Sequence, residues 1–315
     1  MPTVFVRLPN HLGDACMCLP ALELLARGGH ALALVGKPWA PTLFEAYDWP
    51  VLAPRGSWLE RIDALRVARI ALRAERAVLF TNSIGSALEF RLAGFACAGY
   101  ATEARRWLLA NAIAVPAAWT RDMHTVEYYF ELARRSANVE AQVPERLSLR
   151  LTPAAQARAR ALLATAGVDG PYTVLCPAAA GIHHGRVKAW TGYPELCAEL
   201  IAHGVRVVAC PGPGEREVVA AALPGGTILP ETDVATFAAL LRGAQLVVAN
   251  DSGPSHVAAA VGAPLIAIFG VTDPVRTRPW TPDADLVGGR HGWPEFGAVW
   301  ERVRTRLARA VGVPS

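Results

Sequence analysis

The sequence predicts an α/β protein made of two doubly wound domains. Its 315 residues are enough for two domains of about 100–200 residues each. Short apolar runs alternate with longer helical stretches, which is typical of parallel sheets. The alternation occurs twice, on either side of a polar, irregular region around residues 137–151. Open sheets of this kind bind ligands at the carboxyl ends of their strands, so we expect two Rossmann-like domains with the ligand between them.

The expected elements follow from this alternation. In the first series we expect strands over 3–7, 31–35 and 77–80, and helices over 15–27, 58–76 and 125–136. Thr152 can cap a helix over 153–166, because Pro153 suits the first helical position. In the second series we expect strands over 172–176, 205–210, 245–249 and 265–269, and helices over 193–203, 215–223, 233–242, 254–261 and 299–311. We therefore predict domains over 1–165 and 166–296, and a C-terminal helix within 297–315 that packs back toward the first domain.

Composition excludes several classes of protein. The chain is 52% hydrophobic and 18% charged, as in folded globular proteins, and its net charge of +4 does not indicate a nucleic-acid-binding protein. The N-terminus lacks the basic segment and apolar core of a signal peptide. No apolar run approaches the roughly 18–20 residues that span a bilayer. We expect a cytoplasmic protein whose membrane contact, if any, is peripheral.

The six cysteines do not predict a metal site. They form no CxxC pair and no Cys/His spacing that suits zinc, and several lie in apolar runs. We expect buried free thiols. Asp283 and Asp285 form a DxD pair in a proline-containing loop, and we interpret them as a surface turn.

Asp14 is the first candidate for chemistry. The motif Pro9-Asn-His-Leu-Gly-Asp-Ala15 directly follows the first expected strand, so it lies at a ligand-binding edge. One interpretation is that Asp14 only caps the next helix. The other is a carboxylate that the helix dipole keeps ionised, facing the ligand.

A second motif, Asn250-Asp-Ser-Gly-Pro-Ser-His256, stands between a strand and an Ala-rich helix. Ser252 and Gly253 would leave backbone N–H groups pointing out of the helix start, and Gly253 has no side chain to block a close approach. Such a helix start binds phosphate, although an ordinary capped helix is the alternative. A neutral, hydrogen-bonding His256 is expected there, because the helix N-terminus disfavours a cation.

Two further loops follow strands of the second series. Lys188-Ala-Trp190 lies in a loop that also carries His183, His184 and Arg186, and its cation can neutralise a diphosphate unless Lys188 is only a surface residue. The turn Gly212-Pro-Gly-Glu215 starts like a dinucleotide fingerprint, but the third glycine is replaced by Glu217. The pattern of a P-loop NTPase is absent from the sequence.

Together these motifs resemble a known family. The stretch from Val247 to Pro274 resembles the ADP-heptose:lipopolysaccharide heptosyltransferases, glycosyltransferase family nine, and so does Gly13-Asp14 followed by Leu19-Pro-Ala21. Lys188-Ala-Trp190, the Gly212–Glu215 turn and His124-Thr-Val-Glu-Tyr-Tyr129 look like further landmarks of that family. The loop 178–187 departs from the family pattern, since it is apolar and then His-rich.

The resemblance implies a GT-B fold, in which two Rossmann-like domains face a cleft. It implies acceptor binding by the first domain, with Asp14 as general base, and nucleotide-sugar binding by the second. The implied donor contacts are Lys188, Glu215, Asp251, Ser252, Gly253 and His256. The expected reaction is metal-independent and inverting, with ADP-heptose as donor and the anionic lipid A/Kdo core as acceptor. No cofactor is expected.

A basic segment is a candidate acceptor surface. Arg66, Arg69, Arg73 and Arg76 fall on one face of the helix predicted over 58–76, and Arg61 lies near its start. A phosphorylated, anionic lipid core, or the inner membrane surface, suits Arg61, Arg66, Arg69 and Arg73. A solvated helix face is the alternative.

Rival functions remain open at this point. One is a transferase of the same family that uses another nucleotide sugar or acceptor. Another is a catalytically silent sugar-nucleotide-binding protein, against which the carboxylate of Asp14 argues. A Rossmann oxidoreductase is disfavoured by the missing third glycine.

Overall fold

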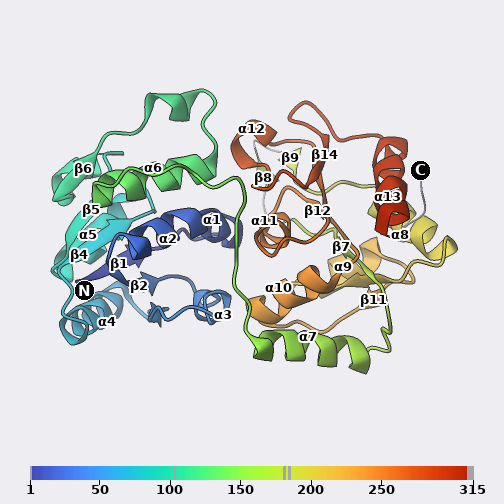
Figure 1. Cartoon of the computed structure of the whole chain (residues 1–315), viewed down its shortest axis with the longest axis horizontal. Coiled ribbons are helices and arrows are strands. Elements are labelled where there is room, and N and C mark those ends of the chain that lie inside the picture. The colour runs from blue at the N-terminus through green and yellow to red at the C-terminus, as the bar shows by residue number, and fades with distance from the viewer. Residues whose placement is uncertain (1, 103, 180–181, 184–185, 311–315) are drawn as a thin grey trace. The chain divides into compact units, whose positions relative to one another are not determined.

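The computed structural model describes residues 2–102, 104–179, 182–183 and 186–310. The chain forms two compact units, Met1–Pro144 and Glu145–Ser315, called unit 1 and unit 2 below. Each contains a six-stranded parallel sheet with helices against it (Figure 1). The prediction of an α/β protein with two doubly wound domains is therefore confirmed.

Unit 1 has its strands in the order β3-β2-β1-β4-β5-β6. The strands are β1 (Thr3–Arg7), β2 (Ala31–Val35), β3 (Val51–Leu52), β4 (Arg76–Leu79), β5 (Ala96–Tyr100) and β6 (Asn111–Ile113). The helices are α1 (Leu12–Met17), α2 (Leu19–Arg27), α3 (Ala40–Leu43), α4 (Trp58–Ala71), α5 (Ile84–Leu92) and α6 (Thr125–Ala137), with 3-10 turns η1 (Arg105–Leu108) and η2 (Ala117–Thr120). The strand order reverses between β1 and β4, and ligands bind at such a switch point.

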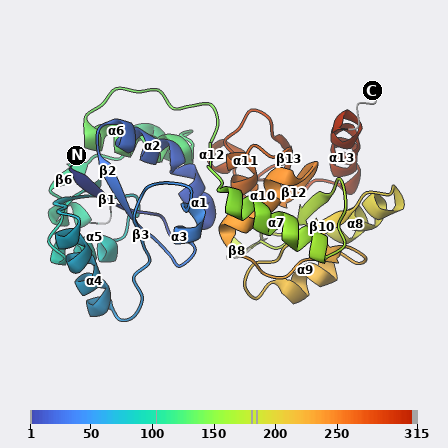
Figure 2. The same ribbon diagram turned by 60° about the horizontal axis from the view of Figure 1, so that its bottom comes forward.

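Two groups of helices cover the sheet of unit 1. On one face α2 packs beside α6, as Figures 1 and 2 both show. On the other face α4 and α5 bury Leu65 and Phe90 in one apolar cluster with Phe5 of β1. Successive strand residues point to opposite faces, so Val4 and Val6, which are also buried, face the α2 side. Burial on both faces explains why β1 is apolar at consecutive positions.

Unit 2 repeats this strand order as β11-β10-β7-β12-β13-β14. The strands are β7 (Thr173–Cys176), β10 (Val207–Ala209), β11 (Thr227–Ile228), β12 (Leu246–Asn250), β13 (Leu265–Phe269) and β14 (Asp285–Gly288), and β8 (Ile182–His183) and β9 (Arg186–Val187) form a separate antiparallel pair. The helices are α7 (Pro153–Thr165), α8 (Tyr193–Ala202), α9 (Arg216–Ala222), α10 (Val234–Gly243), α11 (Gly253–Ala260), α12 (Pro274–Thr277) and α13 (Phe296–Ala310). Its switch point lies between β7 and β12.

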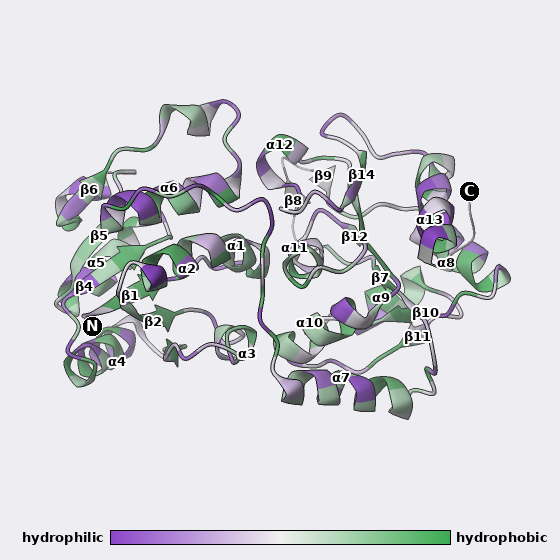
Figure 3. Cartoon of the chain, in the orientation of Figure 1, coloured by the Kyte–Doolittle hydropathy of each residue, from purple (hydrophilic) through white to green (hydrophobic). Residues whose placement is uncertain are grey.

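The core of unit 2 is also double-sided. On one face Leu196 of α8, Val219 of α9 and Val299 of α13 share an apolar cluster with β-strand residues. Elsewhere in the unit α10 packs against α7 and α11, and Figure 2 shows α7 beside α10. Figure 3 shows both hydrophilic and hydrophobic residues on α13, in keeping with a helix that buries one side only.

The division of the chain differs from the predicted boundary at residue 165. Residues 145–165 belong to unit 2, because α7 packs against α10 and two backbone hydrogen bonds fasten the segment before it. Leu147 N donates to Trp280 O at 3.1 Å, and Leu149 N donates to Ala260 O at 2.7 Å. The last helix, α13, contacts β13 and β14 of its own unit.

Some predicted elements were wrong in extent. The helix predicted over 58–76 ends at Ala71, because Arg73 adopts a left-handed conformation (φ 49°) and Arg76 begins β4, where it pairs with Val4. The helix predicted over 15–27 begins earlier, at Leu12, and is interrupted at Cys18, just before Pro20 in the first turn of α2. The structure also contains elements that were not predicted: the helices α3, α5 and α12 and the strands β3, β5, β6, β8, β9, β11 and β14.

Among the described residues, no helix combines the length and apolar character needed to cross a membrane.

Candidate active site

Asp14 lies at the carboxyl edge of the sheet in unit 1. It is the third residue of α1, which follows β1 directly, and it is half-buried. His11 occupies the N-cap position with extended backbone, so Asp14 is not the N-cap residue. A carboxylate in the first turn is stabilised by the helix dipole. The structure therefore places Asp14 at the switch point of the sheet in unit 1, the edge at which folds of this kind bind ligands.

The charge of Asp14 contributes to the raised pKa of several buried neighbours. Burial raises the pKa of Cys16 to about 12, and the Asp14 carboxylate adds to the rise. Burial also raises the pKa of Tyr129 of α6, and Asp14 is the next cause. Tyr129 stands beside Phe80, the residue after β4, with ring centroids 5.5 Å apart. Asp14, the end of β4 and the middle of α6 thus share one neighbourhood.

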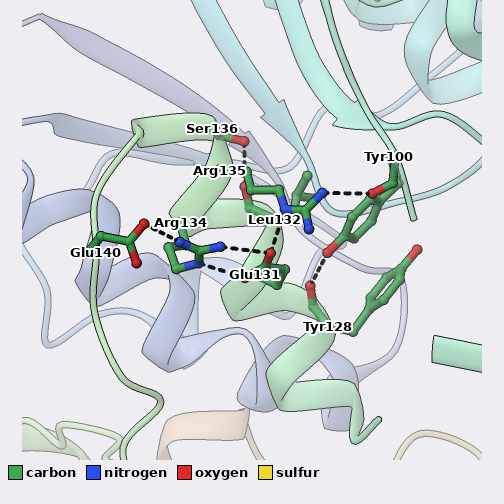
Figure 4. Close-up of polar contacts among 9 residues, drawn as sticks. Tyr100, Tyr128, Glu131, Leu132, Arg134, Arg135, Ser136 and Glu140 are labelled. Atoms are coloured by element: carbon green, nitrogen blue, oxygen red, sulfur yellow. Dashed lines mark hydrogen bonds and ion pairs between the residues drawn. The ribbon is translucent and has the colours of Figure 1, made fainter. Parts of the chain in front are cut away.

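Helix α6 is fixed at both ends. At its start the Nδ1 atom of buried His124 accepts from Val126 N at 3.1 Å, and Glu127 accepts from His124 N at 2.8 Å. Towards its end Arg134 and Arg135 both donate to Glu131, and these hydrogen bonds lower the pKa of Glu131 (Figure 4).

The middle of α6 is held from β5: Tyr100 Oη donates to Tyr128 O of the helix at 2.8 Å, as Figure 4 also shows. The bond ties the helix to the end of β5. The tyrosines of α6 are consequently held in fixed positions at the edge that carries Asp14.

The predicted arginine face is not continuous in the structure. Arg61 donates to Glu89 of α5 at 2.9 Å, Arg66 donates to Asp63 at 2.6 Å and to Leu92 O at 3.2 Å, and Arg69 donates to Ala93 O at 3.0 Å. Arg73 lies beyond the helix and is exposed. Three of the four candidate acceptor residues therefore fasten α4 to the end of α5, and the four do not form one helical face.

Asn250 organises the carboxyl edge of unit 2. It ends β12 and is completely buried at the switch point beside β7. Its Nδ2 donates to Pro177 O, just after β7, at 2.9 Å, and its Oδ1 accepts from Trp190 N at 3.1 Å. Trp190 Nε1 in turn donates to Pro294 O at 3.0 Å. Lys188 therefore projects, half-exposed, from a loop that is anchored two residues later. His184 and the side chains of His183 and Arg186 lie outside the described residues.

Helix α11 begins next to Asn250. Ser252 is the N-cap residue in extended conformation (φ −155°), and its side chain makes no capping hydrogen bond. Instead Ser252 Oγ donates to Asn250 O at 3.3 Å. The N–H groups of the first turn, starting with Gly253, therefore receive no cap from that side chain. A helix start of this kind favours an anion through its dipole and its backbone donors.

A buried Asp–His pair supports the start of α11. Asp251 and His256 are each only 5% exposed, and His256 Nε2 lies 3.8 Å from Asp251 Oδ1. Thr277 of α12 donates to Asp251 Oδ2 at 3.0 Å. Sequence reasoning selected the pair but missed Thr277, which lies 26 residues away and belongs to no motif.

Glu215 is turned toward its own loop. Its carboxylate accepts from Gly212 N at 3.0 Å, which closes the turn before α9. Gly214 has φ +76° and donates its N–H to Glu231 at 3.1 Å, so a left-handed residue is required there. Glu215, which was predicted to bind the sugar donor, thus stabilises the loop at the end of β10 and remains half-exposed at the carboxyl edge of the sheet.

Both aspartates of the DxD pair are engaged by arginines. Asp283 pairs with Arg146 at 2.9 Å, and Asp285 of β14 pairs with Arg306 of α13 at 2.5 Å. In the described part of the chain, no group of three or more metal-ligating side chains is present. The six cysteines are free thiols, as predicted, and five are buried.

Comparison with known proteins identifies a family. A model described as glycosyltransferase family 9 (heptosyltransferase) matches residues 66–299. Lipopolysaccharide heptosyltransferase 3 of Escherichia coli is 35% identical over 144 residues, which is 41% of this chain and 40% of that protein. Lipopolysaccharide heptosyltransferase 2 of E. coli K12 is 31% identical over 130 residues, 38% of this chain and 36% of that protein. The matched part spans about two fifths of the length of these curated relatives.

Solved structures share the whole fold. ADP-heptose lps heptosyltransferase II of E. coli has a TM-score of 0.78 and 23% identity, with 98% of both chains covered. The E. coli heptosyltransferase WaaC with ADP has a TM-score of 0.71 and 21% identity, covering 96% of this chain and 99% of that one. At these identities the likeness establishes the fold.

Proposed function

The chain belongs to glycosyltransferase family 9, and from this premise we propose that it transfers heptose from ADP-heptose to the inner core of lipopolysaccharide. The observation that carries the proposal is the start of α11, where uncapped backbone donors stand beside the buried Asp251–His256 pair at the switch point of unit 2. The curated relatives are named lipopolysaccharide heptosyltransferases. Structures of the same fold hold ADP or ADP-2-deoxy-2-fluoro heptose, which supports an ADP-linked donor.

In the proposed reaction the donor loses ADP, and negative charge grows on the leaving diphosphate. The backbone N–H groups at Ser252 and Gly253 and the Lys188 ammonium stabilise that charge. Lys188 is suited to this task because the Asn250–Trp190 hydrogen bond fixes its loop. The carboxylates of Asp251 and Glu215 accept hydrogen bonds, so they serve sugar and ribose hydroxyls rather than phosphate.

Asp14 acts as the general base in this proposal. An acceptor hydroxyl attacks the anomeric carbon from the face opposite to ADP, so the configuration inverts, and Asp14 takes the proton of that hydroxyl. In the first turn of α1 the helix dipole stabilises negative charge on this carboxylate. We propose that no metal takes part, because the backbone N–H groups and the Lys188 ammonium supply positive charge for the leaving diphosphate.

We propose that unit 1 also meets the membrane in which a lipid-linked acceptor sits. Among the described residues of unit 1, the exposed large apolar side chains all lie on α4, α5 and η1: Trp58, Leu59, Val67, Ile70, Ile84, Leu92 and Trp107. These three elements contact one another in series. Exposed arginines on the same elements, including Arg91 and Arg106, suit anionic lipid headgroups.

Calorimetry and a transfer assay test the proposal. ADP is expected to bind better than UDP or NAD. Transfer from ADP-heptose to a Kdo-lipid A acceptor is expected to continue in EDTA. Tighter binding of UDP would indicate another nucleotide sugar, and ADP binding without transfer would indicate a silent binding protein. Loss of activity in EDTA that Mg²⁺ or Mn²⁺ restores would contradict the metal-free mechanism.

A further inference from the structure

Arg105 is a completely buried arginine at the carboxyl edge of unit 1. Its Nε donates to Tyr100 O at 2.8 Å, its Nη1 donates to Thr81 O, and its Nη2 donates to Asn82 Oδ1 at 3.3 Å. Tyr100 ends β5, and Thr81 and Asn82 follow β4. Burial of a guanidinium is costly unless its N–H groups are bonded. The side chain therefore ties together two neighbouring strand ends.

The surrounding chain is shaped to hold this side chain. Ala104, the preceding residue, is left-handed (φ 57°), a conformation that costs alanine roughly 1–2 kcal/mol. On β5, Gly99 leaves room, because a Cβ added there would lie 3.1 Å from Arg105 Nη2. Strain at one position and a missing side chain at another both serve the insertion of Arg105.

Arg105 determines how the amide of Asn82 is oriented. A guanidinium only donates hydrogen bonds, so the amide atom that faces it must be the oxygen. The amide nitrogen then donates to Tyr128 Oη of α6 at 3.0 Å, and the same hydroxyl lies 3.3 Å from Asn82 Oδ1, to which it donates. An amide nitrogen carries two N–H groups, and Asn82 is only half-buried. The arrangement presents Asn82 as a donor at the edge of the sheet.

This donor and the proposed general base belong to the same edge of the sheet in unit 1. Asn82 follows β4 and Asp14 follows β1, and these adjacent strands flank the switch point of unit 1. The charge of Asp14 reaches Tyr129, whose ring centroid is 5.8 Å from that of Tyr128. Tyr128 in turn contacts Asn82. Asp14 and Asn82 therefore interact with adjacent tyrosines of α6, at the same edge of the sheet.

We propose that Asn82 is a further acceptor-binding residue, whose N–H donates to an oxygen of the acceptor sugar, and that Arg105 and Tyr128 are positioning residues that hold its amide in that orientation. The inference rests on the proposed function. It adds a specificity for oxygen that accepts a hydrogen bond, such as a sugar hydroxyl or the carboxylate of a sugar acid, close to Asp14.

Asn82→Asp is the sharpest test. Aspartate has the same shape and still accepts from Arg105 and Tyr128, so the thermal midpoint should be equal or higher. It has no N–H to give, so the acceptor KM should rise at least tenfold, as expected for one lost hydrogen bond of about 1.4 kcal/mol. The donor KM should stay within twofold. A purely structural role predicts an unchanged acceptor KM, and that result would overturn the proposal.

A pair of Tyr→Phe variants gives an independent measurement. Tyr128→Phe removes the hydroxyl that contacts Asn82 and should raise the acceptor KM. Tyr172→Phe is the matched control, since this buried hydroxyl donates to Leu240 O at 2.7 Å in unit 2 and should affect stability only. Equal acceptor KM values in the two variants would count against a positioning role for Tyr128.

Failure of the proposed function is recognised separately, because wild-type protein would then not transfer heptose. Binding of the sugar acid Kdo, followed by NMR titration, decides the inference in that case. Binding to wild type that is lost in Asn82→Asp supports it. Equal affinity of both proteins, or no binding to either, overturns it.

Discussion

Asp14→Asn separates a structural carboxylate from a catalytic one. Asp14 is the third residue of α1 and half-buried, and asparagine has nearly the same shape. The change removes a favourable interaction with the helix dipole of about 0.3–1 kcal/mol. Cys16, whose pKa is raised to about 12, is neutral at pH 7 with either residue, so its energy hardly changes. The free energy of unfolding should therefore fall by about 1 kcal/mol or less.

The expected effect on catalysis is much larger. An amide cannot take the proton of the acceptor hydroxyl, so general-base catalysis of roughly 10²–10⁴-fold should be lost. That factor corresponds to about 2.7–5.5 kcal/mol of activation free energy, several times the structural effect. The loss should appear in kcat. ADP affinity should remain normal, because the proposed nucleotide contacts all belong to unit 2.

Single-turnover transfer from ADP-heptose is the appropriate assay, since it reports the chemical step even when product release is slow. Thermal melting and ADP calorimetry on the same sample establish folding and donor binding. A variant that folds, binds ADP and keeps more than half of the wild-type rate would refute the role of Asp14. The proton acceptor would then be His11 or His124, although His124 Nδ1 already accepts a backbone hydrogen bond.

Three further changes test other parts of the site. Lys188→Ala should weaken ADP binding in calorimetry, with an effect that shrinks as the salt concentration rises, whereas the control Lys37→Ala in unit 1 should leave ADP binding unchanged. If the Lys188→Ala variant binds ADP as tightly as the wild type, Lys188 is only a surface residue. Asn250→Ala should lower the free energy of unfolding by about 2–4 kcal/mol in urea titration, because the buried Pro177 O and Trp190 N lose their hydrogen-bond partner. A change below about 1 kcal/mol would show that these two hydrogen bonds do not hold the loops together. Replacing both Val67 and Ile70 by serine should reduce flotation of the protein with anionic vesicles without altering its ADP affinity. Unchanged flotation would show that α4 is not part of the membrane-binding surface.

Strongly patterned elements were predictable from the sequence. The strands at Thr3–Arg7, Ala31–Val35 and Leu265–Phe269 agree residue for residue, because consecutive apolar positions match burial on both faces. The helix predicted over 58–76 ran five residues too far, since arginines have good helix propensity and give no stop signal. Its end is set by the left-handed turn at Arg73 and by the pairing of Arg76 with β1.

Site residues divided along similar lines. Asp14, Asp251 and His256 stand in local motifs that follow β1 or β12, as expected: Asp251 comes directly after its strand, and Asp14 and His256 lie in the first turns of the next helices. The side chains that hydrogen-bond to residues of the proposed site come from distant segments of the chain. Thr277 reaches Asp251 across 26 positions, and Arg105 reaches Asn82 across 23. A buried arginine is rare, so its sequence pattern gave no reason to place Arg105 inside the unit rather than among the exposed arginines nearby.

The attachment of residues 145–165 to unit 2 determines how that unit can be produced alone. A fragment starting at residue 166, the boundary that the sequence suggested, would lack α7 and expose the side of α10 that α7 covers. It would also lose the hydrogen bonds from Leu147 and Leu149, which hold the segment to the loop before β14 and to the end of α11. A newly exposed apolar helix face favours aggregation. A fragment starting at Glu145 keeps these contacts and is the one to purify for nucleotide titrations.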